Sequence, residues 1–281
     1  MRSNQTSIPV NLLQGHVPPP EAATYFGQFV DHDLTFDLTP LQEAGFCEPA
    51  DTINHRTPWL DLDHIYGDGP GSERHHHIYE SDDASFRIGH SSFGGEPFDI
   101  PLTEDGLPLL VDDRNGENVM IRQVQAMFLK LHNAAVREVP ANLPPRDRFE
   151  HARERVRWQY QWLVRNWYLR KICEPEVYKA VIERGDRRID WRESGFAIPV
   201  EFSLAAMRFG HSMVRPEYRL NKVARVEGGS GLISLADLFG AKNNVPLDSR
   251  LKIDWALLSR DGAMSIDTAL VEPLFHLPHE H

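Results

Sequence analysis

Apolar residues recur at three- and four-residue steps in four parts of the chain, the spacing that places side chains on one face of an α-helix. The N-terminal helix follows Pro18-Pro19-Pro20 and presents Tyr25, Phe29 and a polar face formed by Gln28 and His32. Two stronger helices carry the stripes Met120, Val124, Met127, Phe128, Leu131, Ala135 and Val156, Tyr160, Leu163, Trp167. A fourth is expected after a Ser203 cap, through Leu204, Met207, His211 and Val214, and is ended by Pro216.

Residues 52 to about 116 lack such a stripe and are rich in Gly, Pro, Asp and His, so we expect a long ordered loop region. Loops of this length inside a compact domain are unusual and suggest that a ligand or metal organises them. Strand patterns are few. The sequence therefore predicts one mainly α domain over residues 1–281 with very little β structure.

Composition narrows the possible partners. The 281 residues are 41% hydrophobic and 25% charged, with a net charge of −11. The acidic balance argues against nucleic acid and anionic membranes as partners. No apolar run approaches the ~20 residues of a membrane span, and the start of the chain lacks a signal-peptide core. Cys47 and Cys173 fit neither a disulfide framework nor a zinc site and are expected to be inert thiols.

The segment Gly27–Leu34, GQFVDHDL, concentrates polar groups in an otherwise apolar helix. Gln28 and His32 share one face, and Asp31 and Asp33 flank the histidine. Burying these groups is costly unless they are used. A solvated helix end is the alternative interpretation.

Oxygen-bearing residues alternate in Thr57-Pro58-Trp59-Leu60-Asp61-Leu62-Asp63. In an extended loop, the side chains of Thr57, Asp61 and Asp63 would face one side, together with the carbonyls of Thr57 and Trp59. Such hard oxygen ligands suit Ca²⁺, and Asp33 would be a further ligand if the loop folds back on the first helix. The alternative is an ordinary Asp-rich turn.

Two further positions carry candidate chemistry. Arg114, in Asp112–Glu117, is a permanent cation that would stabilise negative charge on a bound peroxide, unless it is simply a surface residue in an acidic turn. His211 lies in an apolar helix, where a neutral imidazole could ligate haem iron or could be a hydrogen-bonded core residue. The run His75-His76-His77 is expected to be a solvated loop.

Five motifs in order, GQFVDHDL, RTPWLDLD-x-x-YG, DDRNGEN, FLKLHN (128–133) and RFGH, resemble those of the animal-type haem peroxidase superfamily, also called the peroxidase–cyclooxygenase group, in particular its bacterial members. Together they are far more specific than any one of them. The resemblance implies the mainly α haem peroxidase fold. It also implies a haem-dependent peroxidase that uses hydrogen peroxide to oxidise a small organic donor or halide, with a role in the response to oxidative stress.

The resemblance also implies residue roles. His32 corresponds to the distal histidine, Arg114 to the distal arginine and Gln28 to the distal glutamine. His211 corresponds to the proximal ligand of the haem iron, and Arg208 to an arginine that pairs with a haem propionate.

Asp31 and Glu117 match the carboxylates that form ester bonds to haem b in mammalian members. The Ca²⁺ site maps to Asp33, Thr57, the Trp59 carbonyl, Asp61 and Asp63. Because Asp33 adjoins His32, calcium loss is expected to change the haem spectrum. The resemblance to bacterial members suggests a bacterial protein; its cellular location, cytoplasmic or secreted, and its oligomeric state stay open.

Departures from the family pattern leave alternatives. Asn118 stands where one branch has the methionine of a sulfonium link, so we expect no such link. The chain ends at Pro278-His279-Glu280-His281, soon after the expected proximal helix, so we expect a C-terminally incomplete catalytic domain. A fatty-acid dioxygenase of the same superfamily would carry a tyrosine where Arg208 stands, which favours the peroxidase. A non-catalytic haem- or calcium-binding remnant is the third alternative.

Overall fold

The computed structural model describes residues 19–37, 53–92, 95, 97–186, 198–222, 232–241, 244–260, 262–264, 266, 269–272 and 274. Within these ranges the protein is mainly helical, as predicted, and its paired strands are the two-residue strands β1 (Glu217–Tyr218) and β2 (Ile233–Ser234), which run antiparallel. The three longest helices are α1 (Glu21–Leu34), α3 (Val119–Glu138) and α4 (Pro145–Leu163). The shorter elements are α2 (Asp63–Tyr66), η3 (His76–Ile78), η4 (Asp113–Gly116), η5 (Val164–Tyr168), α5 (Leu169–Ile172), α6 (Pro175–Tyr178), η6 (Lys179–Glu183), α7 (Val200–Leu204), η7 (Ala206–Met213), α8 (Leu235–Phe239), η8 (Ser249–Leu251) and α9 (Trp255–Leu258).

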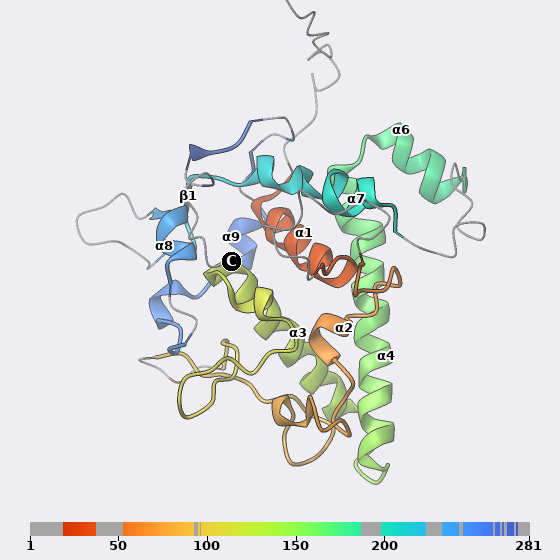
Figure 1. Cartoon of the computed structure of the whole chain (residues 1–281), viewed down its shortest axis with the longest axis vertical. Coiled ribbons are helices and arrows are strands. Elements are labelled where there is room, and N and C mark those ends of the chain that lie inside the picture. Colours follow the sequence, from red (N-terminus) through yellow and green to blue (C-terminus); the bar gives the residue numbers. More distant parts are fainter. Residues whose placement is uncertain are drawn as a thin grey trace, which may run out of the picture.

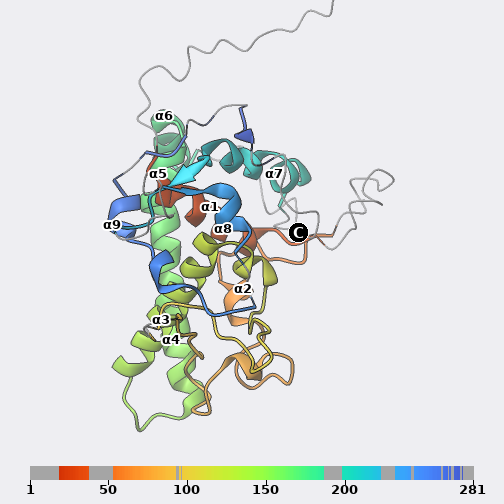
Figure 2. The same ribbon diagram turned by 90° about the vertical axis from the view of Figure 1, so that its left-hand side faces the viewer.

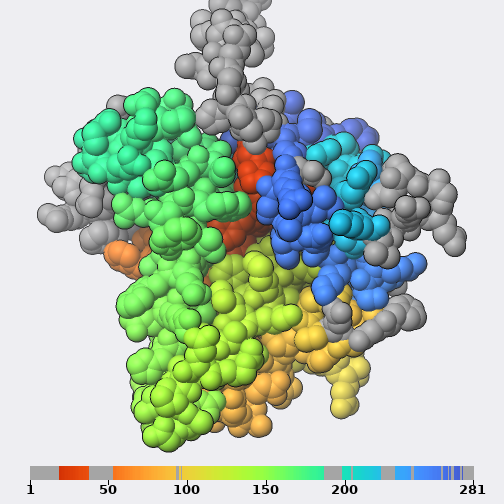
Figure 3. Space-filling model, turned by 180° about the vertical axis from the view of Figure 1, so that it is seen from behind, coloured from red at the N-terminus to blue at the C-terminus, as the bar shows by residue number. Residues whose placement is uncertain are grey.

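Helix α1 occupies the centre of the molecule, between α3, α4 and the teal segment that contains α7 (Figures 1 and 2). From behind, only a narrow red band of it is visible between green and blue neighbours (Figure 3). Eleven of its residues are buried, including the polar side chains of His32 and Asp33. Its polar groups are therefore enclosed by protein, and the alternative of a solvated helix end is wrong for these two residues.

Helices α3 and α4 pack side by side against α1 and build the main hydrophobic core. The Asn118 side chain caps α3 by accepting hydrogen bonds from the amides of Met120 and Ile121, at 3.0 and 2.9 Å. Glu117 thus precedes the helix. The predicted stripe is buried except that Leu131 is partly buried and Met127 is 41% exposed.

Short elements separated by loops fill most of the region between residues 53 and 118, as predicted. Two residues of the FLKLHN motif attach this region to α3. The His132 ring contacts the Ala84 carbonyl through Nε2 at 2.8 Å, and the Asn133 amide pairs with the backbone N–H and carbonyl of Phe86, each at 2.8 Å. His75 is buried and accepts a hydrogen bond from the Asp68 amide at 3.0 Å, so its predicted solvated setting is wrong.

The predicted fourth helix is divided into two elements. Helix α7 ends at Leu204, Ala205 leaves the helical region with φ −126° and ψ −64°, and η7 continues as a 3-10 helix. Ser203 lies inside α7, where its hydroxyl donates to the Val200 carbonyl at 3.3 Å, so it is no N-cap. No helix of the described ranges is both long and apolar enough to cross a bilayer.

Candidate functional site

One face of α1 carries three of the predicted site residues, Gln28, Asp31 and His32, at helical spacing. The His32 ring is buried, and its Nδ1 lies 2.8 Å from Oδ1 of Asn115 in η4. Burial, followed by the nearby charge of Arg114, lowers the pKa of His32 to about 3. The imidazole is therefore neutral at physiological pH, as a proton acceptor must be.

Arg114 is held beside His32 by a carboxylate from its own turn. Its guanidinium donates to Asp112 at 3.0 and 2.8 Å and to the His32 backbone carbonyl at 3.1 Å. Asp112 also caps η4 by accepting from the Arg114 amide. Although burial acts against it, these hydrogen bonds to Arg114 hold the pKa of Asp112 well below its usual range. Arg114 is thus a fixed cation in a defined orientation.

Arg56 reinforces the same arrangement from the neighbouring loop. Its Nε donates to the His32 carbonyl at 3.1 Å, its Nη2 pairs with Asp112, and its Nη1 lies 3.4 Å from Asp63. Both guanidinium groups lie over the Phe36 ring, at 5.0 Å for Arg56 and 4.8 Å for Arg114. Arg56 therefore connects the His32 carbonyl, the Asp112 carboxylate that also holds Arg114, and the Asp63 carboxylate.

Gln28 is oriented by residues that precede and begin α3. Its Nε2 donates to Glu117, and its Oε1 accepts from Nδ2 of Asn118 at 3.4 Å. Burial raises the pKa of Glu117 to about 7, although Arg114 and the bond from Gln28 act in the opposite direction. Asn118 thus both caps α3 and orients Gln28.

The Asp31 carboxylate lies on the same face of α1 as Gln28 and His32 and accepts a hydrogen bond from the Thr35 hydroxyl at 3.1 Å. Burial raises its pKa, and the charges of Arg208, Arg114 and His211 all act against that rise, so these groups lie within electrostatic reach of Asp31. His211 is exposed rather than enclosed in an apolar helix, and partial desolvation together with Arg208 lowers its pKa. Helix α1 packs against η7, so the seven residues predicted for the haem side lie on neighbouring elements: α1, η4, the residue before the Asn118 cap of α3, and η7.

A second cluster of polar side chains lies where α1 meets α2 and begins at Asp33, the residue after His32. Ligand atoms of Asp33, Asp63 and His64 lie within 4.8 Å of one another. The His64 Nδ1 contacts Asp33 Oδ1 at 2.9 Å. Oxygen atoms of Asp33 (Oδ2), Asp61 (Oδ1) and Asp63 (Oδ1) are buried without a hydrogen-bond partner. Burial raises the pKa of Asp63 to about 6, with a further contribution from the charges of Asp33 and Asp61. Converging buried carboxylate oxygens of this kind fit a hard cation such as Ca²⁺.

The loop reaches this arrangement through a coiled rather than an extended backbone, so the predicted extended conformation is wrong. Leu60 and Leu62 have φ of 53° and 63°, a left-handed conformation that costs of order 1 kcal/mol or more for such residues and concentrates at functional sites. The Thr57 hydroxyl donates to Asp61 Oδ2 at 3.0 Å, and the Trp59 carbonyl accepts from Gln161 at 3.1 Å. Thr57 and Trp59 therefore lie in the same loop as Asp61 and Asp63. The Trp59 carbonyl oxygen, which accepts a hydrogen bond from Gln161, retains a second lone pair for a cation.

Sequence reasoning missed four residues of these networks: Arg56, His64, Asp112 and Asn115. Each lies inside or directly beside a quoted motif, so the signal was present. Their importance rests on partners far away in sequence, such as the 83 residues between His32 and Asn115.

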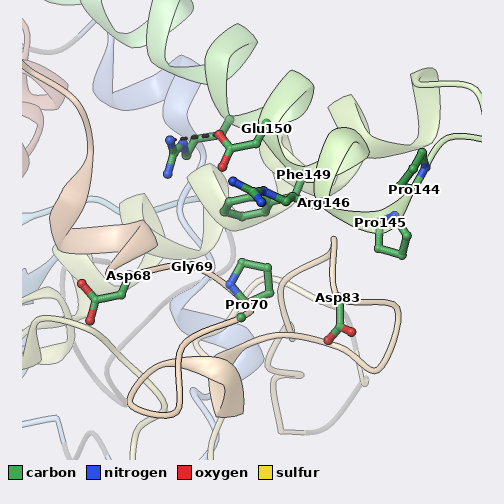
Figure 4. Close-up of a pocket in the computed structure, with 11 residues that line it drawn as sticks. Asp68, Gly69, Pro70, Asp83, Pro144, Pro145, Arg146, Phe149 and Glu150 are labelled. Atoms are coloured by element: carbon green, nitrogen blue, oxygen red, sulfur yellow. Dashed lines mark ion pairs between the residues drawn. The ribbon is translucent and has the colours of Figure 1, made fainter.

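A pocket of about 540 Å³ lies elsewhere, between the start of α4 and the loop 68–71 (Figure 4). Phe149, Arg146 and Glu150 line it on the helix side, and Asp68 and Pro70 on the loop side. Its lining includes none of the predicted site residues.

Comparison with known sequences supports the same family. The family model of the animal haem peroxidases matches residues 37–265. A peroxidase-like protein of Margaritifera margaritifera is 26% identical over 263 residues, covering 68% of this chain and 31% of that protein. Thyroid peroxidase of Mus musculus is 24% identical over 191 residues, covering 61% of this chain and 20% of that protein. The chain thus spans a third or less of the length of these relatives.

Solved structures share the fold at low identity. The fatty acid alpha-dioxygenase of Oryza sativa superposes with a TM-score of 0.62 at 16% identity, over 88% of this chain and 49% of that one. Peroxidase A of Dictyostelium discoideum superposes with a TM-score of 0.50 at 15% identity, over 90% of this chain and 58% of that one. With the family model matching most of its length, the chain belongs to the animal haem peroxidase family.

Proposed function

We propose that this chain is a haem-dependent peroxidase that uses hydrogen peroxide to oxidise a small organic donor or a halide. The observation that carries the proposal is the pairing of His32 with Arg114. A buried, neutral imidazole and a fixed guanidinium, which donates to the backbone carbonyl of the same histidine, combine a proton acceptor with a cation. Those two groups are what the heterolytic cleavage of a peroxide requires.

The residues opposite this pair suit haem b. His211 makes no side-chain hydrogen bond within the described chain, and a Cβ at Gly210 would meet no atom within 4 Å. The imidazole is thus accessible to an iron atom, and Arg208 would pair with a haem propionate. Asp31 and Glu117 are the carboxylates available for ester attachment. When bound, the haem group would supply the two electrons that O–O cleavage consumes.

Three side chains of the protein carry out the proton transfer, the charge stabilisation and the orientation of the substrate. His32 would take a proton from one peroxide oxygen and deliver it to the other, the leaving oxygen, which departs as water. Arg114 stabilises the negative charge that develops there. Gln28, held at both ends of its amide by Glu117 and Asn118, orients a water or halide beside them.

Calcium fits the cluster of Asp33, Asp61 and Asp63, completed by Thr57 and the Trp59 carbonyl. The buried carboxylate oxygens of Asp33 (Oδ2) and Asp61 (Oδ1), which accept no hydrogen bond, support this assignment, because such atoms are costly without a cation. Asp33 follows His32 directly, so a cation here would stabilise the end of α1 that carries the proton acceptor.

The test begins with a visible absorption spectrum after adding haemin and then hydrogen peroxide. A sharp Soret band that shifts with peroxide is expected; a broad spectrum of free haem would favour a non-catalytic remnant.

His32→Ala should retain haem and lose nearly all peroxide-driven donor oxidation. His211→Ala should lose iron ligation, and an unchanged spectrum would exclude it as the ligand. Haem that resists acid–organic extraction would support ester linkage through Asp31 or Glu117.

Fatty-acid dioxygenation is the second candidate, because the fold is shared with the rice alpha-dioxygenase at a TM-score of 0.62. Arg208 in place of the expected tyrosine argues against it. Oxygen uptake with an unsaturated or saturated fatty acid, in the absence of donor oxidation, would select this candidate over the peroxidase.

A further inference from the structure

Asn115 is completely buried, and it forms the only hydrogen bond that the described chain offers to the His32 ring. The contact joins His32 Nδ1 and Asn115 Oδ1 at 2.8 Å. A carbonyl oxygen only accepts hydrogen bonds. The ring nitrogen that faces it must therefore carry the proton, which leaves the lone pair of the neutral imidazole on Nε2.

A third side chain pairs with the nitrogen of the Asn115 amide. Its Nδ2 donates to Oε1 of Gln125, a buried residue of α3, at 3.0 Å. Turning the Asn115 amide alone would place its oxygen against that of Gln125. With the amides in this orientation, Asn115 accepts at its oxygen from the His32 ring and donates at its nitrogen to Gln125, so both polar atoms of the buried amide are paired.

The local backbone holds Asn115 and Arg114 in one short element. Both belong to η4, in which the Asn115 amide donates to the Asp112 carbonyl at 3.0 Å. The same turn thus delivers the guanidinium to the backbone carbonyl of His32 and the amide oxygen to its ring.

We propose that Asn115, oriented by Gln125, is a positioning residue that keeps His32 as the Nδ1–H tautomer with Nε2 free to accept a proton. The catalytic meaning of this role rests on the proposed peroxidase function; the tautomer itself does not. When Nε2 gains a proton from peroxide, Nδ1–H keeps its bond to Asn115. No rearrangement is needed before Nε2 gives the proton to the leaving oxygen.

The tautomer can be measured without haem. The full chain, labelled with nitrogen-15 in histidine, is studied by proton–nitrogen correlation NMR, and the His32 signals are assigned by their loss in His32→Gln. The wild-type protein should show His32 protonated at Nδ1. A wild-type ring protonated at Nε2 would overturn the proposal, whatever the variants do.

Variants of Asn115 separate positioning from packing. Asn115→Leu removes the acceptor at similar volume and should shift His32 toward the Nε2–H form, whereas Asn115→Asp retains an acceptor oxygen and should preserve Nδ1–H. Asn133→Leu is the matched control. The side-chain amide of Asn133 is also hydrogen-bonded, but its partner is the Phe86 backbone instead of the His32 ring. It should leave the His32 tautomer unchanged. Retention of Nδ1–H in a folded Asn115→Leu would also overturn the proposal.

Kinetics of the haem-loaded chain then test the consequence. Asn115→Leu should lower kcat/KM for peroxide by up to about 100-fold, part of the usual contribution of a positioned base. The KM for the reducing donor and the haem content should not change, and Asn115→Asp should recover most of the rate. If neither the wild type nor any variant turns over peroxide, but NMR shows His32 protonated at Nδ1 as expected, the proposed function fails and the positioning role survives. An unaffected peroxide rate in an active Asn115→Leu would overturn the role in catalysis.

Discussion

The His64 ring donates through Nδ1 to Asp33 Oδ1 at 2.9 Å, and neither side chain has any exposed surface. This contact ties α2 to α1 at the residue that follows His32. Because it uses one carboxylate oxygen, Asp33 Oδ2 is left buried and without a partner. His64 thus acts as an orienting support for a carboxylate that faces the proposed cation.

Calcium should therefore stabilise the protein measurably. We expect added Ca²⁺ to raise the Tm and a chelator to reverse the change, with a concomitant change in the haem spectrum of the loaded chain. In Asp61→Asn the calcium-dependent rise in Tm should be largely lost, because one charged ligand is removed. The comparison is with Asp105→Asn, an exposed residue outside the cluster. Equal responses of the two variants in calorimetry would refute the cation site.

Arg56 should be far more important for stability than an arginine in an exposed ion pair. Arg56→Met leaves Asp112 buried with one cation fewer, and we expect a loss of about 3 kcal/mol in the free energy of unfolding. Arg155→Met removes a pair with Glu138 in which both side chains are at least half exposed, and should cost less than about 1 kcal/mol. Urea unfolding of the two variants measures the difference. Similar losses would contradict a supporting role for Arg56.

Stability should depend on pH through Glu117. Its pKa is raised to about 7 in the folded chain from 4.5 for an ordinary glutamic acid. The folded state therefore binds the proton more tightly, and stability falls as the pH rises from about 4.5 to about 7. Glu117→Gln keeps an acceptor for Gln28 but cannot ionise, so it should gain up to about 3 kcal/mol over the wild type between these limits. Denaturant titrations at pH 5 and pH 8 measure this gain, with Glu104→Gln, an exposed site, as control. A gain that is the same at both pH values would argue against Glu117 as its source.

Gly27 should resist substitution although it lies within a helix. Replacing a helical glycine by alanine usually stabilises by about 0.5–1 kcal/mol. At Gly27, however, the added Cβ would lie 2.3 Å from the Tyr168 hydroxyl oxygen. We expect Gly27→Ala to lower the Tm and a second change, Tyr168→Phe, to recover much of the loss.

Gly71→Ala provides the reference, because its Cβ would meet no atom within 4 Å. In thermal denaturation, the Tm of Gly71→Ala should equal or exceed that of the wild type. A Gly27→Ala protein more stable than wild type would mean that Tyr168 moves away without cost.

The sequence by itself determined the helices whose apolar stripes are long and regular. Helices α1, α3 and α4 lie where their periodicity predicted them, because helix formation and burial of one face are both encoded within a few turns of chain. The order of the motifs was likewise enough to predict the family. It also selected residues that the fold does bring together, such as Asp33 with Asp63.

Only the tertiary structure decided how those residues are oriented. The break at Ala205, the exposure of His211 and the left-handed Leu60 and Leu62 follow from packing between distant segments, which no local pattern records. The pairing of His32 with Asn115 and of Asp33 with His64 spans 83 and 31 residues. Hydrogen bonds between groups so far apart exist only after the hydrophobic core has placed α1 against η4 and α2, so their chemistry is a property of the fold rather than of any one motif.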